Sequence, residues 1–143
     1  MPHRTISEII ENQQLLALPL TTTVSEAADR MRRQKVGAVA VVTDGRLVGV
    51  FTERDALFRV VAEGRDARTT RLAEVMTRDP QTIHPAKPFG HALHMMFEGG
   101  FRHVPVVEDG RPVGIVSARD ALGPELREFV SDLGNRDHIS EVL

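Results

Sequence analysis

The chain of 143 residues has a net charge of −2 and contains 41% hydrophobic and 27% charged residues, which is typical of one globular domain and excludes a disordered protein. The absence of cysteine excludes disulfides and thiolate metal sites, and the near-neutral charge argues against a nucleic-acid-binding surface over the whole domain. No apolar run approaches the roughly 20 residues of a membrane span, and the N-terminus has no apolar signal-peptide core, so we expect a cytoplasmic protein without a membrane partner.

The predicted elements alternate between helices and hairpins. Apolar residues recur at helical spacing over 24–31, and Thr23 and Glu26 have the spacing of a capping box at the start of this helix. Residues 38–42 and 47–51 are predicted strands of one hairpin, because the intervening Asp44-Gly45 favours a type I′ turn. A second helix over 89–96 and a second hairpin, with strands at 104–107 and 113–116 around Asp109-Gly110, follow. A last helix is predicted over 126–133, ending near Gly134, and the tail to residue 143 is unassigned.

Residues 82–122 repeat the sequence pattern of residues 17–57 without a gap. At an offset of 65, 14 of the 41 aligned pairs are identical, and the preceding segments 6–10 and 72–76 also resemble each other at an offset of 66. Each copy has the predicted order strand, helix, strand, tight turn, strand, helix. Such a period indicates one supersecondary unit built twice, with each copy burying its apolar face against the other. We therefore expect any site to occur in pairs.

The third strand of each copy is followed by a hydroxyl residue, an arginine and an aspartate, at residues 52–55 (T-E-R-D) and 117–120 (S-A-R-D). An aspartate in this place can accept hydrogen bonds from two ribose hydroxyls. The hydroxyl and the helix N-terminal amides favour a phosphate, and the arginine adds a charge-assisted contact. The same spacing is also a capping box, so a purely structural role stays open. The arginine, present in both copies, favours a ligand because a cap does not need it.

The duplicated unit resembles a tandem pair of CBS domains, the module named after cystathionine β-synthase and also called a Bateman module. The residues that carry the resemblance are G-V-F-T-E-R-D, G-I-V-S-A-R-D and F-R-H-V-P-V-V, and it spans roughly residues 5–123. It implies an α/β protein of the α+β type, with two β-α-β-β-α repeats packed as a pseudo-two-fold pair and an extra C-terminal helix. We expect one module over 1–143, with repeat 1 at about 5–64, a linker at about 65–70, repeat 2 at about 71–123, and the helix and tail at 124–143.

The family resemblance also implies a ligand that contains adenosine, namely AMP, ADP, ATP, NAD or S-adenosylmethionine, bound in two clefts between the repeats. By position in the motif, the ribose hydroxyls would be held by Asp55 and Asp120. The phosphate partners would be Thr52, Ser117, Arg54 and Arg119. The adenine would lie against Gly37, Ala38, Val39, His103, Val104 and Pro105, enclosed by Leu18, Thr82 and Ile83.

The two copies differ beside the predicted adenine position. The second copy has Arg102 where the first has Gly37, so only the second offers an extra cation near a phosphate. Whether Arg102 serves the cleft of its own repeat or that of its neighbour is open at this point. We hypothesise that the clefts differ in affinity and that only one fills at low ligand concentration.

The sequence predicts a regulatory module and not an enzyme. It has no phosphate-binding glycine-lysine loop and no nucleophile paired with a base, so we expect no catalytic residue, no metal and no catalytic cofactor. No effector domain shares the chain, so we expect regulation of another protein in trans, and the resemblance implies a homodimer that forms a disc of four repeats. Two alternatives are a nucleotide-processing enzyme and a structural interaction module with empty clefts, in which Asp55 and Asp120 are only helix caps.

Overall fold

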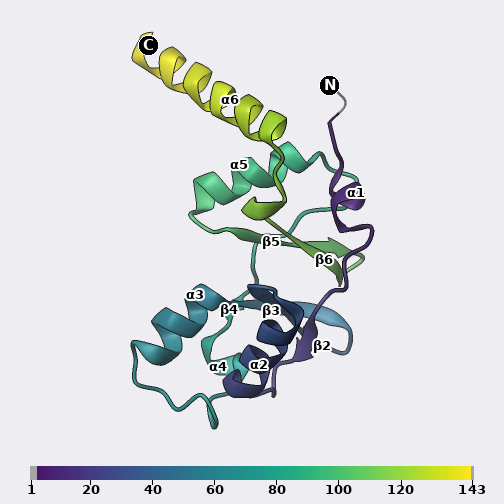
Figure 1. Ribbon diagram of the computed structural model, residues 1–143, viewed down its shortest axis with the longest axis vertical. Helices are drawn as coiled ribbons and strands as arrows, with labels where there is room; N and C mark the ends of the chain where they lie inside the picture. Colours follow the sequence, from purple (N-terminus) through teal and green to yellow (C-terminus); the bar gives the residue numbers. More distant parts are fainter. Residues whose placement is uncertain (1–2, 143) are drawn as a thin grey trace.

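The structure is a computed structural model that describes residues 3–142, with side chains described for residues 3–135. Two halves are stacked along the long axis, and a C-terminal helix projects from the upper half (Figure 1). The helical elements are α1 (Ile6–Ile10), α2 (Val24–Gln34), α3 (Glu53–Asp55), the π-helix η1 (Ala56–Val61), α4 (Leu72–Val75), α5 (Phe89–Gly99), the 3-10 helix η2 (Ala118–Asp120) and α6 (Gly123–Val142). The strands are β1 (Ala17–Pro19), β2 (Ala38–Thr43), β3 (Arg46–Thr52), β4 (Thr77–Arg78), β5 (His103–Glu108) and β6 (Arg111–Ser117).

The two hairpins, β2–β3 and β5–β6, repeat each other in detail. Both central residues of each turn, Asp44-Gly45 and Asp109-Gly110, have positive φ, as the predicted type I′ turns require. The register of the first hairpin shifts between Val41 and Val42, and that of the second shifts at the equivalent step between Val106 and Val107. The duplication seen in the sequence is therefore also a duplication of local backbone geometry.

Each half of the molecule completes its core with the helix that precedes the other half. Helix α4 follows the first copy in the chain, and its Leu72 and Val75 are buried in the first core, where Phe51 also lies. Helix α1 precedes the first copy, yet it lies beside the upper half (Figure 1), and its Ile6 is buried in the second core together with Phe89. These two helices, which we call the lead-in helices, are thus exchanged, and neither core is complete without the helix that precedes the other repeat in the chain.

The exchanged segments also complete the edges of the two sheets. Strand β4, directly after α4, pairs antiparallel with β3 through Gly49 and Val50. At the equivalent edge of β6 the side-chain amide of Gln13 takes the place of a strand, donating to the carbonyl of Ile115 at 2.8 Å and accepting from its amide at 2.7 Å. Glycine is needed here, because a Cβ on Gly49 would lie 2.5 Å from Met76 Sδ and one on Gly114 would lie 2.8 Å from Ile10 Cγ2.

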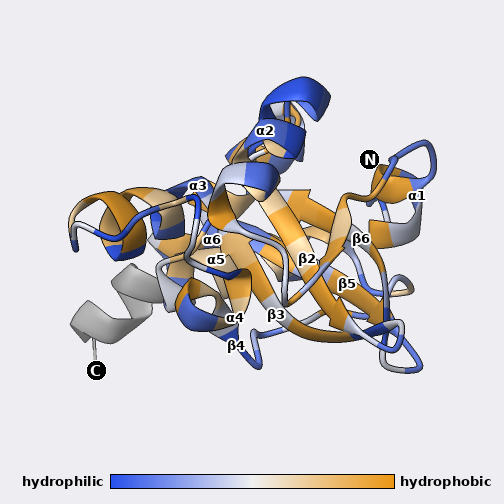
Figure 2. Cartoon of the chain, turned by 90° about the horizontal axis from the view of Figure 1, so that it is seen from below, coloured by the Kyte–Doolittle hydropathy of each residue, from blue (hydrophilic) through white to orange (hydrophobic). Residues whose placement is uncertain are grey.

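Small apolar side chains join the two sheets face to face. Ala38, Ala40, Val50 and Ile115 form a buried cluster between the halves, distinct from the two cores that lie under the helices. Figure 2 shows the apolar strands inside and the polar face of α2 outside. The predicted mixed α/β fold, with two repeats related by a pseudo-two-fold axis, is confirmed. No helix within residues 3–142 has both the length and the hydropathy to cross a membrane.

Three details of the sequence prediction are wrong. The second copy has no closing helix of its own: only the 3-10 turn η2 follows β6, and the helix restarts at Gly123, because Pro124 favours a first-turn position. This last helix does not end near Gly134 but continues to Val142, since a glycine inside a helix costs only about 1 kcal/mol. The first strand of the second copy is reduced to a single bridge between Ile83 and Val106.

The exchange of lead-in helices makes Ile6 important for the stability of the distant second core. Replacing Ile6 with alanine should lower the free energy of unfolding by about 2–5 kcal/mol, because a fully buried side chain would leave a cavity beside Phe89. Urea unfolding followed by circular dichroism measures the change. The matched control is Ser7→Ala, on the exposed face of the same helix, which should stay within about 0.5 kcal/mol of the wild type. A loss for Ile6→Ala no larger than that of the control would contradict the packing of α1 in this core.

Candidate functional site

The two acid-bearing turns are built in the same way. At the end of β3, the Thr52 amide and hydroxyl donate to Asp55 Oδ2 at 3.0 and 3.1 Å, and the Asp55 amide donates to the Thr52 hydroxyl at 3.2 Å. At the end of β6, the Ser117 amide donates to Asp120 Oδ2 at 2.8 Å. Each aspartate therefore uses one carboxylate oxygen to hold its own turn. The other oxygen, Oδ1, is the one that can accept a hydrogen bond from a ligand or from another side chain.

Each turn opens into a cleft that the other repeat completes. The first, which we call the Asp120 cleft, has a volume of about 390 Å³ and joins Ser117, Arg119 and Asp120 to the start of β2 at Gly37 and Ala38. The second, the Asp55 cleft, has a volume of about 630 Å³ and joins Thr52, Arg54 and Asp55 to the segment from Gly99 to His103 that leads into β5. Both volumes fall in the range of small-molecule sites.

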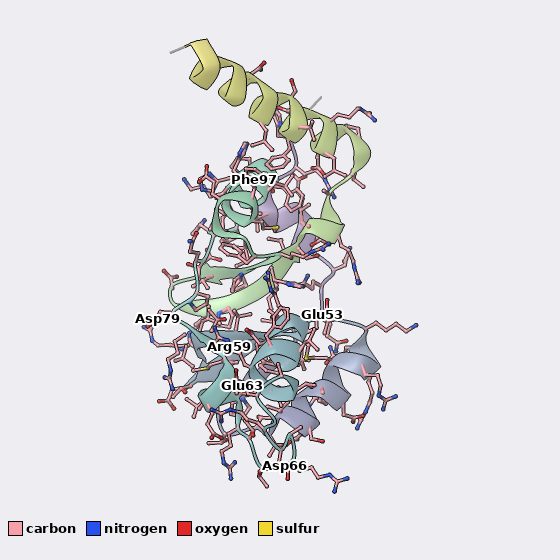
Figure 3. The ribbon with its side chains drawn as sticks, turned by 90° about the vertical axis from the view of Figure 1, so that its left-hand side faces the viewer. Glu53, Arg59, Glu63, Asp66, Asp79 and Phe97 are labelled. Atoms are coloured by element: carbon pink, nitrogen blue, oxygen red, sulfur yellow. The ribbon has the colours of Figure 1, made fainter. Side chains whose placement is uncertain are left out.

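Arg102, His103 and Glu53 line both clefts and form the wall between them. Glu53 lies at the boundary of the two halves in Figure 3. Arg102 therefore does not serve one cleft alone, because it lines both the Asp120 cleft and the Asp55 cleft. A Cβ on Gly37 would lie 3.0 Å from Glu53 Oε1 and 3.3 Å from His103 Nε2, so a larger residue at that position would require these side chains to shift.

The acidic turns, the arginines, Gly37, Ala38 and His103 line the clefts, but six of the other predicted adenine contacts do not. Side chains alternate along a strand, so Val39 turns away from Ala38 into the helix-covered core, and Val104 turns away from His103 in the same way. The residues placed outside the clefts are Leu18, Val39, Ile83, Val104 and Pro105, which are buried, and Thr82, which is exposed elsewhere.

Sequence reasoning missed the residues that precede the first strand of each repeat. Leu15 and Leu16 line the Asp120 cleft, and Pro80 and Gln81, at the equivalent positions of the second copy, line the Asp55 cleft. Lys35, at the C-terminal end of α2, also lines the Asp120 cleft. The offset of 65 relates these two segments and could have indicated that they are equivalent. Their position in the clefts follows from the exchange of lead-in segments, which the sequence does not reveal.

The charges of the two clefts differ. The Asp120 cleft has three cations against two carboxylates, and the Asp55 cleft has three against three. The former set is Lys35, Arg102 and Arg119 with Glu53 and Asp120, and the latter is Arg54, Arg59 and Arg102 with Glu53, Asp55 and Asp79. Only the Asp120 cleft therefore has an excess of positive charge that favours an anionic ligand.

The polar groups of the Asp120 cleft also form fewer hydrogen bonds and ion pairs within the protein than those of the Asp55 cleft do. Among the described side chains, none forms a hydrogen bond or ion pair with Asp120 Oδ1 or with the guanidinium groups of Arg102 and Arg119. In the Asp55 cleft, Arg54 donates to the Gly100 carbonyl at 3.3 Å and lies over the Phe58 ring. A ligand in the Asp120 cleft would therefore meet donors and an acceptor that are not already paired.

His103 is held in its neutral form. Burial lowers the pKa of its imidazole below the usual value; nearby Glu53 opposes this shift, and Arg102 and Arg119 strengthen it. A neutral imidazole between the clefts can offer one donor and one acceptor without adding charge. No group of three or more histidine and acidic side chains in the described part of the chain is arranged to hold a metal ion.

Comparison with known proteins agrees with this architecture. The sequence matches the CBS domain family over residues 6–62 and 72–123. It is 32% identical to a mitochondrial CBS domain-containing protein of Arabidopsis thaliana, CBSX3, over 78% of this chain and 56% of that protein. It is 37% identical to the Bacillus subtilis CBS domain-containing protein YhcV, over 68% and 69% of the two chains. A CBS domain protein of Pyrobaculum aerophilum complexed with AMP has the same fold, with a TM-score of 0.79, 28% identity, and coverage of 90% and 99%.

The lowered pKa of His103 predicts acid sensitivity of the fold. Between the folded pKa and the higher unfolded pKa near 6.5, the unfolded chain binds more protons, so the free energy of unfolding must fall as the pH drops through this window. Urea unfolding at pH 7.5 and 5.5 should show a smaller acid-induced loss in His103→Gln than in the wild type. The control His91→Gln removes an exposed imidazole on α5 and leaves the burial of His103 unchanged. Equal losses in wild type and His103→Gln would contradict the prediction.

Proposed function

Because this chain belongs to the CBS domain family, we propose that it is a regulatory module that binds an adenosine-containing ligand between its repeats. The observation that carries the proposal is the Asp120 cleft, which places an unpaired carboxylate oxygen, a hydroxyl and three cations around a cavity of nucleotide size at the boundary of the two halves. The AMP bound by the similar Pyrobaculum protein supports an adenosine ligand. Candidate ligands are AMP, ADP, ATP, NAD and S-adenosylmethionine.

Each part of such a ligand has a partner in the Asp120 cleft. The ribose hydroxyls would donate to Asp120, whose Oδ1 has no partner among the described side chains. The phosphate would accept hydrogen bonds from the Ser117 hydroxyl and from Arg119 and Arg102. The bonds from the two arginines would be the strongest, because both partners are charged. The base would lie against Leu15, Leu16, Gly37 and Ala38, which bring apolar surface and backbone from the first repeat.

Ligand binding here would act on the packing of the two repeats. The Asp120 cleft takes its acidic turn from the second repeat and its strand start from the first, so a bound ligand touches both. A ligand shifts such an equilibrium only by its difference in affinity between two packings. We propose that this shift is the regulatory signal, that a partner protein responds to it, and that the protein is not an enzyme.

The same proposal includes a homodimer with the four-repeat arrangement of the family. Exposed apolar side chains are found on the helices of both repeats: Leu57, Phe58 and Val61 on the stretch from α3 to η1, and Phe97 on α5. Figure 3 looks onto these helices and labels Phe97. A second copy would bury these side chains, which a monomer leaves in water.

A structural module with empty clefts is the second candidate, and one observation favours it. Both aspartates hold their own turns through capping hydrogen bonds, so each has a structural role that does not involve a nucleotide. The two readings differ in whether the length of the side chain at position 120 affects binding or only stability.

A thermal-shift panel with AMP, ADP, ATP, NAD, NADH, S-adenosylmethionine and GTP tests the proposed function. A ligand at 100 times its Kd adds about 2.7 kcal/mol of stability, which should raise the melting temperature by several degrees. We expect a rise confined to adenine compounds. The absence of a rise with any of them would favour the structural module.

Asp120→Glu separates the clamp from the cap. Glutamate suits the third position of a capping box but is too long for a fixed ribose contact, so the variant should keep its melting temperature without ligand and lose the ligand-induced rise. The matched control is Asp55→Glu, which makes the same change at the equivalent turn of the Asp55 cleft and should keep the rise. An unchanged rise in Asp120→Glu would show that Asp120 is only a cap.

A further inference from the structure

We infer that Arg59 limits each chain to one nucleotide by occupying the carboxylate of Asp55, so that only the Asp120 cleft is free to bind. This inference rests on the proposed function and adds which cleft is used and which residue decides it. It identifies Arg59 as a residue that sets the number of binding sites, a role that the acidic motif itself does not indicate.

The guanidinium of Arg59 lies against the oxygen that a ribose would need. Arg59 Nε is 3.4 Å from Asp55 Oδ1, and Asp55 Oδ2 already accepts from the amide and hydroxyl of Thr52. The Asp55 side chain is only 11% exposed, and both its oxygens are engaged within the protein. Arg59 itself lines the Asp55 cleft, one helical turn beyond the aspartate. A ribose hydroxyl would have to displace or share this ion pair.

Two further hydrogen bonds hold Arg59 in place. Its Nη1 donates to the carbonyl of Met76 at 2.9 Å and to that of Val75 at 3.4 Å, at the end of α4. Figure 3 labels Arg59 on the helix just below the boundary of the two halves. Because α4 belongs to the exchanged lead-in, the arginine is bound to two separate segments at once. Releasing it for a ligand would leave two carbonyls without this donor as well as one carboxylate without its cation.

The second copy has no such arginine. Position 124, at the offset of 65 from Arg59, is a proline at the start of α6. Asp120 Oδ1 is accordingly without a partner among the described side chains. Arg4 also lies near Asp120, but it donates to the Asp120 backbone carbonyl at 2.8 Å and pairs with the Glu125 carboxylate, so Oδ1 stays without a direct partner. The two copies thus share the acidic turn and differ in whether an arginine pairs with its carboxylate.

Size does not explain a difference between the clefts. The Asp55 cleft, at about 630 Å³, is larger than the Asp120 cleft, at about 390 Å³, so volume does not favour the Asp120 cleft. The difference in binding that we propose is therefore chemical. The ion pair between Arg59 and Asp55 is the contact in that cleft that competes directly for the ribose-binding carboxylate.

Isothermal titration of four proteins with AMP, and separately with ATP, tests the inference. The proteins are the wild type, Asp120→Glu, Arg59→Met and the double variant. We expect one site in the wild type, none in Asp120→Glu, two in Arg59→Met, and one in the double variant, which would bind in the Asp55 cleft at least about tenfold more tightly than Asp120→Glu binds anywhere. Methionine keeps the unbranched apolar part of the side chain without the guanidinium group.

Further variants separate release of the carboxylate from loosening of the fold. The amide of Arg59→Gln ends at the position of Nε, so it keeps a neutral donor near Asp55 Oδ1 but is too short for the Met76 carbonyl. It should therefore open the second site less fully than Arg59→Met, whereas equal opening would indicate that the loss of the contacts with α4 is responsible. Arg65→Met removes an exposed arginine that pairs with Glu74 outside both clefts and should change nothing. Melting temperatures without ligand confirm that each variant is folded.

Each result identifies which claim fails. Two sites in the wild type, or no binding by the folded double variant, would overturn the role of Arg59 while leaving nucleotide binding intact. No binding of AMP or ATP by any of the four proteins would overturn the proposed function and the role of Arg59 together. A site lost in Arg59→Met would show that the arginine holds a ligand phosphate instead of excluding a ligand.

Discussion

The exchange of lead-in helices is the constraint on which the rest of the structure depends. Ile6 is buried in the second core and Leu72 in the first, so each core includes the helix that precedes the other repeat in the chain. The chain must therefore cross between the halves on both sides, directly over Gly49 and Gly114. These crossings bring the lead-in residues to the boundary, where they line the clefts. Without the exchange there would be two similar domains, but no shared clefts between them.

The two clefts have equivalent backbones but different side chains. The hairpins agree down to the position of their register shift, and the acidic turns have the same hydrogen bonds to one carboxylate oxygen. The differences are single residues, chiefly Gly37 against Arg102 and Arg59 against Pro124. Duplication therefore fixes where a ligand could lie, and substitution at a few positions determines which of the two places is chemically free.

The sequence could predict what depends on short-range chemistry. The Asp-Gly turns, the strands beside them and the hydroxyl and acid of each turn are determined by residues within a few positions of one another, and the structure has them as expected. The contribution of Leu15 or Lys35 to a cleft was not predictable, because it depends on the path of the chain between the halves. The side chains of Val39 and Val104 lie in the two cores, because side chains alternate along a strand, so only the backbone of these residues is on the side of the clefts.

A crystal structure determined with saturating AMP tests the central claim most directly. The account predicts one AMP per chain, in the Asp120 cleft, with its ribose hydroxyls on the Asp120 carboxylate and its phosphate beside Ser117 and Arg119. The Arg59–Asp55 pair should remain intact in the same crystal. AMP bound in the Asp55 cleft, or an Asp120 cleft that stays empty at saturation, would contradict it.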